Sequence, residues 1–191
     1  MKLLTLATGI LALAAPLALA QTSNWTIDPA HSSIEFTVRH MSVSNIHGRF
    51  AIQSGKILLN EADITKSTVQ VTIDAASVDT GVSMRDNDLK SPNFFEVASF
   101  PTASFTSTSV AKSGSGLTVT GNLTLHGVTK PVVLDVEGPS APAPGMDHKP
   151  HSGYSASTTL KRTDFGIAAK YPPAVIGDDV KMVIDLEVVK Q

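Results

Sequence analysis

The sequence contains no cysteine, and only 5% of its residues are aromatic and 17% are charged. The lack of cysteine excludes disulfide bonds and thiol chemistry, so the fold must be held together by packing alone. The formal net charge of −2 gives no basic footprint for nucleic acid or for an anionic membrane surface. The chain also lacks a Gly-x-Ser-x-Gly nucleophile motif, a Walker-type phosphate loop and a His-Glu-x-x-His zinc motif. These absences favour a binding protein over an enzyme.

The first 20 residues have the features of a secretory signal peptide. Lys2 provides the positive start, Leu3 to Leu13 form a short apolar region, and Ala18 to Ala20 form a small-x-small cleavage site. A transmembrane anchor fits less well, because Pro16 interrupts the apolar run and no charged stop follows it. We therefore expect a periplasmic protein that begins at Gln21 and has no integral membrane span.

Residues 21–191 are dominated by short β-branched segments separated by glycine, serine, asparagine, aspartate and proline. In the clearest segment, Ile34, Phe36 and Val38 alternate with polar neighbours, as in a strand with one buried face. Strands are predicted over 24–28, 32–41, 46–59, 68–74, 102–111, 117–126, 131–137, 153–162 and 180–189. Since no linker divides these segments into two cores, we expect one all-β domain, either a barrel or a sandwich.

One segment, residues 80–97, breaks the strand pattern. It predicts a short helix over about 83–90, with Thr80 or Ser83 as the N-cap residue, followed by an aromatic turn. Such a helix could cover one end of a barrel. The proline-rich stretch 138–153 is predicted to be a flexible loop between two strands.

Successive predicted strands place apolar side chains on one face and polar side chains on the other. The apolar residues can simply fill a core, or a barrel of about eight strands can leave a central slot for one ligand. This face is mostly aliphatic, with few aromatic rings to fill a barrel centre, which is compatible with a cavity. The residues expected to line it are Phe36, Val38, Phe50, Val71, Leu123, Leu134, Met182 and Ile184, with Phe94 and Phe95 from the aromatic turn.

Several motifs occur in the order found in a known family. The first is Trp-x-Ile-Asp-x-x-His-Ser, beginning at Trp25, and the second is Phe-x-Val-x-His-Met, ending at Met41. Further along come Leu-Thr-x-His-Gly-Val-Thr-x-Pro, ending at Pro131, and Arg-x-Asp-Phe-Gly, ending at Gly166. With these motifs the chain resembles the YceI-like family of secreted bacterial proteins. The resemblance implies an antiparallel lipocalin-like β-barrel of about eight strands, with the helix near one opening, that binds a polyisoprenoid or another long-chain amphiphile.

Four polar residues are candidates for a role at the ends of the barrel. His40 continues the inward series of its strand, so we expect it near one mouth, as a structural group or as a partner of a ligand head group. Arg85, on the predicted helix, either pairs with Asp86 to fasten the helix or binds a phosphate through its planar guanidinium. Arg162 and Asp164 present the same choice near another strand end.

The remaining histidines raise the question of a metal site. Asp28 and His31 flank a Pro-Ala turn, and turn chemistry accounts for them. Residues 147–151 contain two histidines, but Pro150 stands between them in a predicted flexible loop, and a metal site needs three or four convergent ligands. We therefore predict no metal and no cofactor.

The sequence thus predicts non-catalytic binding, transport or storage of an amphiphilic lipid in the periplasm. The candidate lipids are a polyisoprenoid, an isoprenoid phosphate or pyrophosphate, and an isoprenoid quinone. Burying ten methylene equivalents would contribute about 8 kcal/mol before the costs of ordering. Two alternatives stay open, an enzyme acting on an isoprenoid or lipid ester and a ligand-free stress or interaction protein with a filled barrel. A homodimer also stays open.

Overall fold

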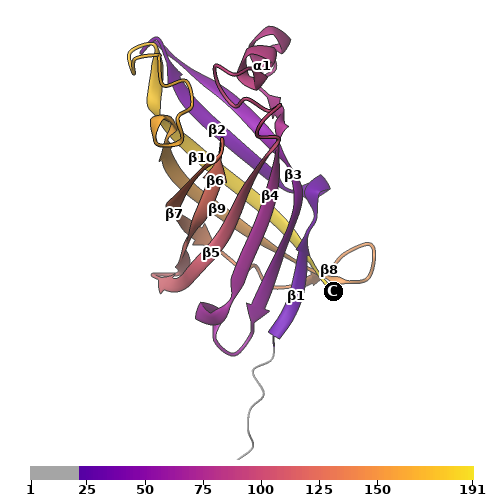
Figure 1. The fold of residues 1–191 in the computed structure, drawn as a ribbon. Coiled ribbons are helices and arrows are strands. Elements are labelled where there is room, and N and C mark those ends of the chain that lie inside the picture. Colours follow the sequence, from indigo (N-terminus) through magenta and orange to yellow (C-terminus); the bar gives the residue numbers. More distant parts are fainter. Residues whose placement is uncertain (1–21) are drawn as a thin grey trace, which may run out of the picture.

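The computed structural model describes residues 22–191, so the predicted signal peptide lies outside the described residues (Figure 1). The strands are β1 (Thr22–Ile27), β2 (Ser33–His40), β3 (Ser44–Asn60), β4 (Thr68–Asp79), β5 (Thr102–Ser113), β6 (Gly116–Leu125), β7 (Val128–Glu137), β8 (Ala143–Pro144), β9 (Pro150–Lys161) and β10 (Ile176–Lys190). The helical elements are α1 (Ser83–Lys90) and the 3-10 turns η1 (Pro29–His31), η2 (Ile64–Lys66) and η3 (Arg162–Phe165).

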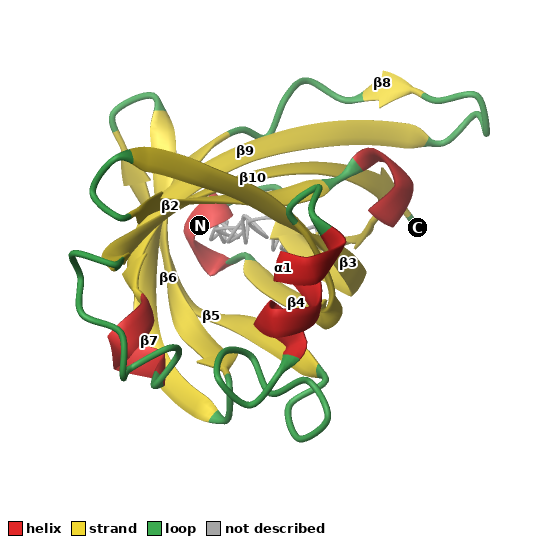
Figure 2. Cartoon of the chain, turned by 90° about the horizontal axis from the view of Figure 1, so that it is seen from above, coloured by secondary structure: helices red, strands yellow, loops and turns green. Residues whose placement is uncertain are grey.

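Eight strands form a closed antiparallel ring in the order β10, β2, β3, β4, β5, β6, β7, β9 and back to β10. The closing pair is long, because β10 and β9 pair continuously from Asp179 with Lys161 to Val189 with His151. Figure 2 looks down this ring and shows α1 at the end nearest the viewer. The predicted barrel with a helix near one opening is therefore confirmed, and the sandwich is excluded.

One position in the ring, between β10 and β3, is filled by two strands in succession. β2 occupies one half of it, and β1 occupies the other half, where it pairs with β3 from Thr22 to Thr26 and with β10 from Trp25 to Ile27. We call the junction between them, residues 28–32, the seam. At the seam the Asp28 carboxylate accepts a hydrogen bond of 2.9 Å from the amide of Ala30, which confirms the predicted turn chemistry.

The strand predictions hold for the nine segments named from sequence, with ends that differ by a few residues. The segment 138–153 is the exception, because it is not one continuous loop. β8 lies inside it and pairs with the start of β9, where Ala143 faces His151. A two-residue strand is too short to produce an alternating pattern, which explains why the sequence did not indicate it.

Helix α1 has the predicted bounds but not the predicted cap. Its N-cap residue is Val82, which has no side chain able to accept a hydrogen bond. Instead, Asp86 in the first turn accepts hydrogen bonds from the backbone amide and the hydroxyl of Thr80, at 2.9 and 2.5 Å. The helix is therefore fastened by a residue inside it. Over residues 22–191, no helix is long and apolar enough to cross a membrane.

Candidate functional site

The interior of the barrel contains two apolar cavities. The helix-end cavity, below α1, has a volume of about 140 Å³, and the far-end cavity has a volume of about 130 Å³. Five side chains line both of them and form the boundary between them, namely Ile34, Ile73, Leu123, Leu160 and Met182. Because the walls are inward faces of strands, the two cavities follow one another along the barrel. Together they form a divided apolar interior.

Most of the predicted cavity residues lie in these walls. The helix-end cavity is lined by Phe36, Val38, Phe50, Phe94 and Phe95, the far-end cavity by Val71, Leu134 and Ile184, and both by Leu123 and Met182. Close packing of β2 on β3 depends on a glycine, because a Cβ atom at Gly48 would lie 2.3 Å from the ring of Phe36. The inward register is therefore as predicted. Contact of these side chains with a ligand stays a prediction.

The aromatic turn after α1 forms part of the wall of the helix-end cavity. The ring of Phe95 meets the ring of Phe50 edge to face, with 5.3 Å between their centroids. The ring of Phe94 stacks on Tyr171 at 5.8 Å, so it joins the turn to the loop between η3 and β10. Leu89 of α1 adds an aliphatic side chain to the same wall. These rings are half-buried and stand between the cavity and solvent.

Arg162 is a wall residue whose role differs from both predicted alternatives. Its side chain is buried, with 4% of the residue exposed, and its five N–H groups donate to five backbone carbonyl oxygens at 2.6 to 3.1 Å. The acceptors are Gly177, Ile167, Ala168, Tyr171 and Ile176. Because every donor is used, Arg162 forms neither the ion pair nor the phosphate contact considered from sequence. It holds the loop that borders the helix-end cavity.

The far-end cavity contains the remaining polar side chains of the interior. Within the described chain these are the hydroxyl groups of Ser67, Tyr154 and Thr158. Burial raises the pKa of the Tyr154 phenol to about 12, so this group is neutral at physiological pH. Ser67 is already in use, since its hydroxyl accepts a hydrogen bond from the amide of Asn60. The interior thus offers uncharged hydroxyls and no free charge.

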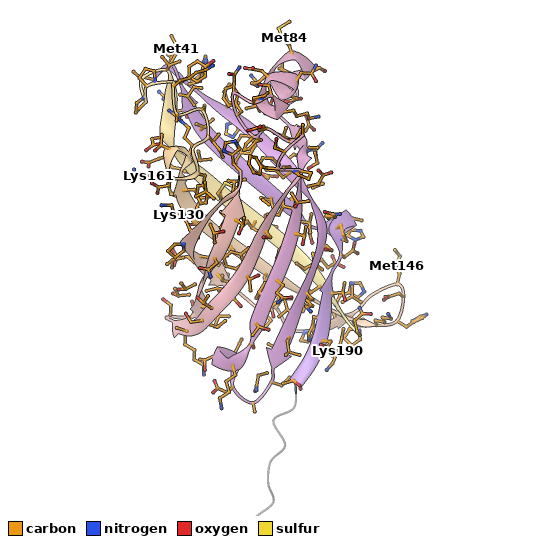
Figure 3. All side chains as sticks on the ribbon, viewed as in Figure 1. Met41, Met84, Lys130, Met146, Lys161 and Lys190 are labelled. Atoms are coloured by element: carbon orange, nitrogen blue, oxygen red, sulfur yellow. The ribbon has the colours of Figure 1, made fainter. Side chains whose placement is uncertain are left out.

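His40 and Arg85 do not line either cavity. His40 is exposed at the end of β2, next to Met41, at the end of the barrel that carries α1 (Figure 3). Its inward position was predicted by extending the alternation to the last residue of the strand, and the structure differs there. Arg85 donates to the hydroxyl and the carbonyl oxygen of Thr80 at 2.7 and 2.9 Å, and no ion pair with Asp86 forms. Thr80 is thus the shared partner of both helix residues.

Some wall residues were not singled out from the sequence. On β9, Tyr154, Ala156, Thr158 and Leu160 face inward in alternation. The period of two was present, but alanine and threonine between outward serines and threonines give little contrast in hydrophobicity. Phe165 and Ile167 lie in or beside η3 rather than in a strand, so no periodicity could place them in the wall.

Comparison with known proteins gives a consistent result. A family model described as the YceI-like domain matches residues 25–188. The chain is 39% identical over 191 residues to a UPF0312 protein of Serratia proteamaculans, covering 98% of this chain and 96% of that protein. It is also similar to a mutant YCEI protein of Campylobacter jejuni, with 32% identity, a TM-score of 0.70, and coverage of 78% of this chain and 87% of that one.

A third similar structure agrees in fold. It is described as a polyisoprenoid binding domain from Saccharophagus degradans and superposes with a TM-score of 0.62. The match covers 87% of this chain and 98% of that chain, with 21% identity. At 21% identity, this similarity shows a shared fold and nothing more.

Proposed function

Because the chain belongs to the YceI-like family, we propose that its apolar interior binds the hydrocarbon chain of an isoprenoid lipid. The observation that carries this proposal is the pair of apolar cavities lined end to end by inward-facing strands. The isoprenoid class is chosen because a protein of similar fold is described as a polyisoprenoid binding domain. Carriage or storage of the lipid in the periplasm is part of the proposal, and its location rests on the N-terminal sequence.

The size of the cavities indicates how such a lipid would enter. An engineered cavity of roughly 150 Å³ holds one benzene molecule, so each cavity here matches one small apolar group. A longer chain must pass between the two cavities and displace their shared side chains. Met182 can make way most readily, because its unbranched thioether has several low-energy conformations. We therefore place the path of the chain past Met182.

The chemistry of the interior restricts the lipid's polar end. A phosphate or pyrophosphate inside the barrel would need a cationic partner, because burying an unpaired charge is very costly. Arg162 cannot serve, since all its donors are bound to carbonyl oxygens. The buried part of the ligand is therefore uncharged, as in a polyisoprenoid chain, its alcohol or a quinone. A charged head group, if present, stays outside the barrel.

A substitution at the boundary of the cavities tests this proposal. Met182→Trp places a large ring where the two cavities meet, so the space is filled and a bound chain is displaced. We expect retention of lipid to fall at least tenfold, measured by native mass spectrometry of protein purified from the periplasm of its own cells. The matched control is Val183→Trp, the next residue on β10, which is 48% exposed on the outer face.

The two variants separate binding from general damage. Overpacking a core costs about 1–3 kcal/mol, so the melting temperature of each variant is recorded beside its lipid content. Loss of lipid in Met182→Trp with an intact fold supports the proposal. Wild-type protein that carries no lipid, or equal retention in both variants, rejects it in favour of a filled barrel.

A further inference from the structure

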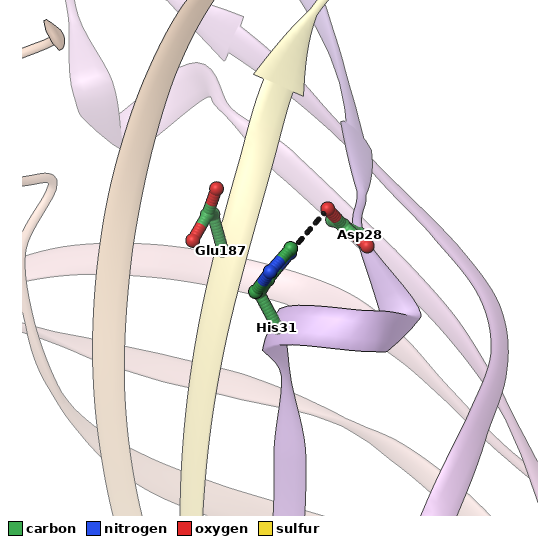
Figure 4. Close-up of side chains that lie close together, drawn as sticks. All are labelled: Asp28, His31 and Glu187. Atoms are coloured by element: carbon green, nitrogen blue, oxygen red, sulfur yellow. Dashed lines mark hydrogen bonds and ion pairs between the residues drawn. The ribbon is translucent and has the colours of Figure 1, made fainter. Parts of the chain in front are cut away.

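Three metal-ligating side chains converge outside the barrel interior, at the seam. Asp28 and His31 come from the turn between β1 and β2, and Glu187 comes from β10 (Figure 4). One ligand atom from each lies within 4.8 Å of the others, and His31 Nδ1 is 2.8 Å from Asp28 Oδ2. None of the three lines either cavity. The lipid proposal therefore does not account for this cluster.

Backbone hydrogen bonds fix the positions from which these side chains project. The amide of Asp28 donates to the carbonyl oxygen of Glu187 at 2.9 Å, and the amide of Glu187 donates to the hydroxyl of Ser32 at 3.0 Å. The seam is thus tied to β10 on both sides of the cluster. The amide of Ala30 binds Asp28 Oδ1, which leaves Oδ2 directed toward His31. The backbone positions of the three residues are therefore fixed relative to one another.

A fourth side chain orients Glu187. His151 of β9 places its Nδ1 atom 2.5 Å from Glu187 Oε1 and its Nε2 atom 2.9 Å from Asp147 Oδ1. The His151 imidazole contacts one oxygen of Glu187 and leaves the other available. Such outer partners typically orient metal ligands.

The two carboxylates at the seam pair with histidines rather than with permanently charged side chains. Across residues 22–191, the ion pairs of Asp28 and Glu187 are made with His31 and His151, and no lysine or arginine takes part. The nearby charge of Lys149 interacts with Asp147, which lies at the outer edge of the cluster and is not one of its three members. Two carboxylates on neighbouring elements thus face each other across His31.

We propose that Asp28, His31 and Glu187 form a site for one divalent cation of the zinc class. One imidazole nitrogen and two carboxylate oxygens are a ligand set that zinc accepts, with water at the fourth position. Calcium and magnesium prefer six or more oxygen ligands, which the seam does not supply. Tetrahedral ligands around zinc are about 3.4 Å apart, so the side chains must close slightly. They can do so because the His31 side chain is 64% exposed and its ring is free to adjust.

The bound cation would join the turn between β1 and β2 to β10. At this junction the strand that pairs with β10 changes from β1 to β2. The effect is therefore a metal-dependent clamp on the barrel wall, separate from the cavities inside.

Zinc titration of the chelator-treated protein tests this site. Calorimetry with zinc chloride is expected to show saturable binding of one ion per chain, and calcium and magnesium are expected to give no such binding. Glu187→Gln and His31→Gln each remove one ligand and are expected to weaken zinc binding at least tenfold. The control is His40→Gln, which removes an exposed histidine far from the seam and should leave binding unchanged.

Melting curves with and without zinc provide a readout of the clamp. Zinc should raise the melting temperature of the wild type and of His40→Gln, and should not raise that of the ligand variants. If Glu187→Gln fails to fold, His31→Gln decides the matter, since its exposed side chain is not needed for packing. The proposal is overturned if the wild type shows no stoichiometric binding, or if both ligand variants bind zinc as tightly as the wild type.

Discussion

Arg162 illustrates how a single residue can determine the shape of a loop. Its guanidinium donates hydrogen bonds to five backbone carbonyl groups that would otherwise need water as a donor. In the sequence, Arg162 and Arg85 appear equivalent, since each is followed closely by an aspartate. Only the fold distinguishes them, because one guanidinium is enclosed by a loop and the other lies beside Thr80. The role of Arg162 could not be predicted from the sequence, because it depends on how the loop after η3 folds around the guanidinium.

Arg162→Lys is expected to lower the free energy of unfolding by about 2–6 kcal/mol, because two of the five carbonyl groups lose their donor. Lysine has three donors for five carbonyl groups, and each buried acceptor left unpaired costs about 1–3 kcal/mol. Urea denaturation measures the change. Arg49→Lys is the control, because Arg49 is an exposed partner of Asp79 and such surface pairs contribute about 0–1 kcal/mol. Equal losses in the two variants would contradict the structural role of Arg162.

At the scale of the element, alternation predicted the strands and their inward faces well. β2 is the clearest case, because Ile34 and Phe36 are buried while Glu35 is exposed. The same rule misplaced His40, which still pairs with Ser44 and Ile176 but is exposed, beyond an irregularity in the pairing of β2 with β10. Helix α1 was bounded correctly by its composition, but its fastening was not, because Asp86 and Thr80 lie on either side of the cap. Local patterns therefore give elements more reliably than their ends.

The aromatic turn after α1 yields a prediction for this element. Replacing Phe94 and Phe95 together with alanine removes two rings between the helix-end cavity and solvent. Lipid retention is expected to fall at least tenfold, because the hydrocarbon chain becomes accessible to water. The measurement is the rate at which a bound fluorescent lipid transfers to empty vesicles.

Phe100→Ala is the matched control for the aromatic turn. Phe100 is half-buried and packs against His126 at 5.0 Å, and it lines neither cavity. Its loss should leave the transfer rate unchanged. A double variant that retains lipid and stability like the wild type would argue against a closing role for the turn.

The whole molecule is a ring whose interior is shared by all eight of its strands. Closure removes the edges that an open sheet would expose, which suits a chain without disulfide bonds. The ring was foreseen from the length and spacing of the strands and from the family resemblance. Its division into two cavities was not foreseen, because the boundary depends on how the side chains of β2, β4, β6, β9 and β10 meet.

Removal of the lipid should lower the stability of the whole barrel. A ligand that binds only the folded state raises its stability by mass action, so delipidated protein is expected to melt at a lower temperature than loaded protein. Adding back an isoprenoid alcohol should restore the melting temperature in the wild type. The Met182→Trp variant should melt at the same temperature before and after treatment. A wild-type melting curve that is indifferent to lipid would count against occupation of the interior.

The shared ring position between β10 and β3 also sets the order in which the chain can fold. Trp25, near the start of the described chain, pairs with Lys190, near its end. A polypeptide emerges from its N-terminus, so β1 and β2 must wait for β10 before either is paired on both sides. Contacts between such distant residues require closure of a long loop and make folding slow. The barrel is thus completed only after β10 has been synthesised.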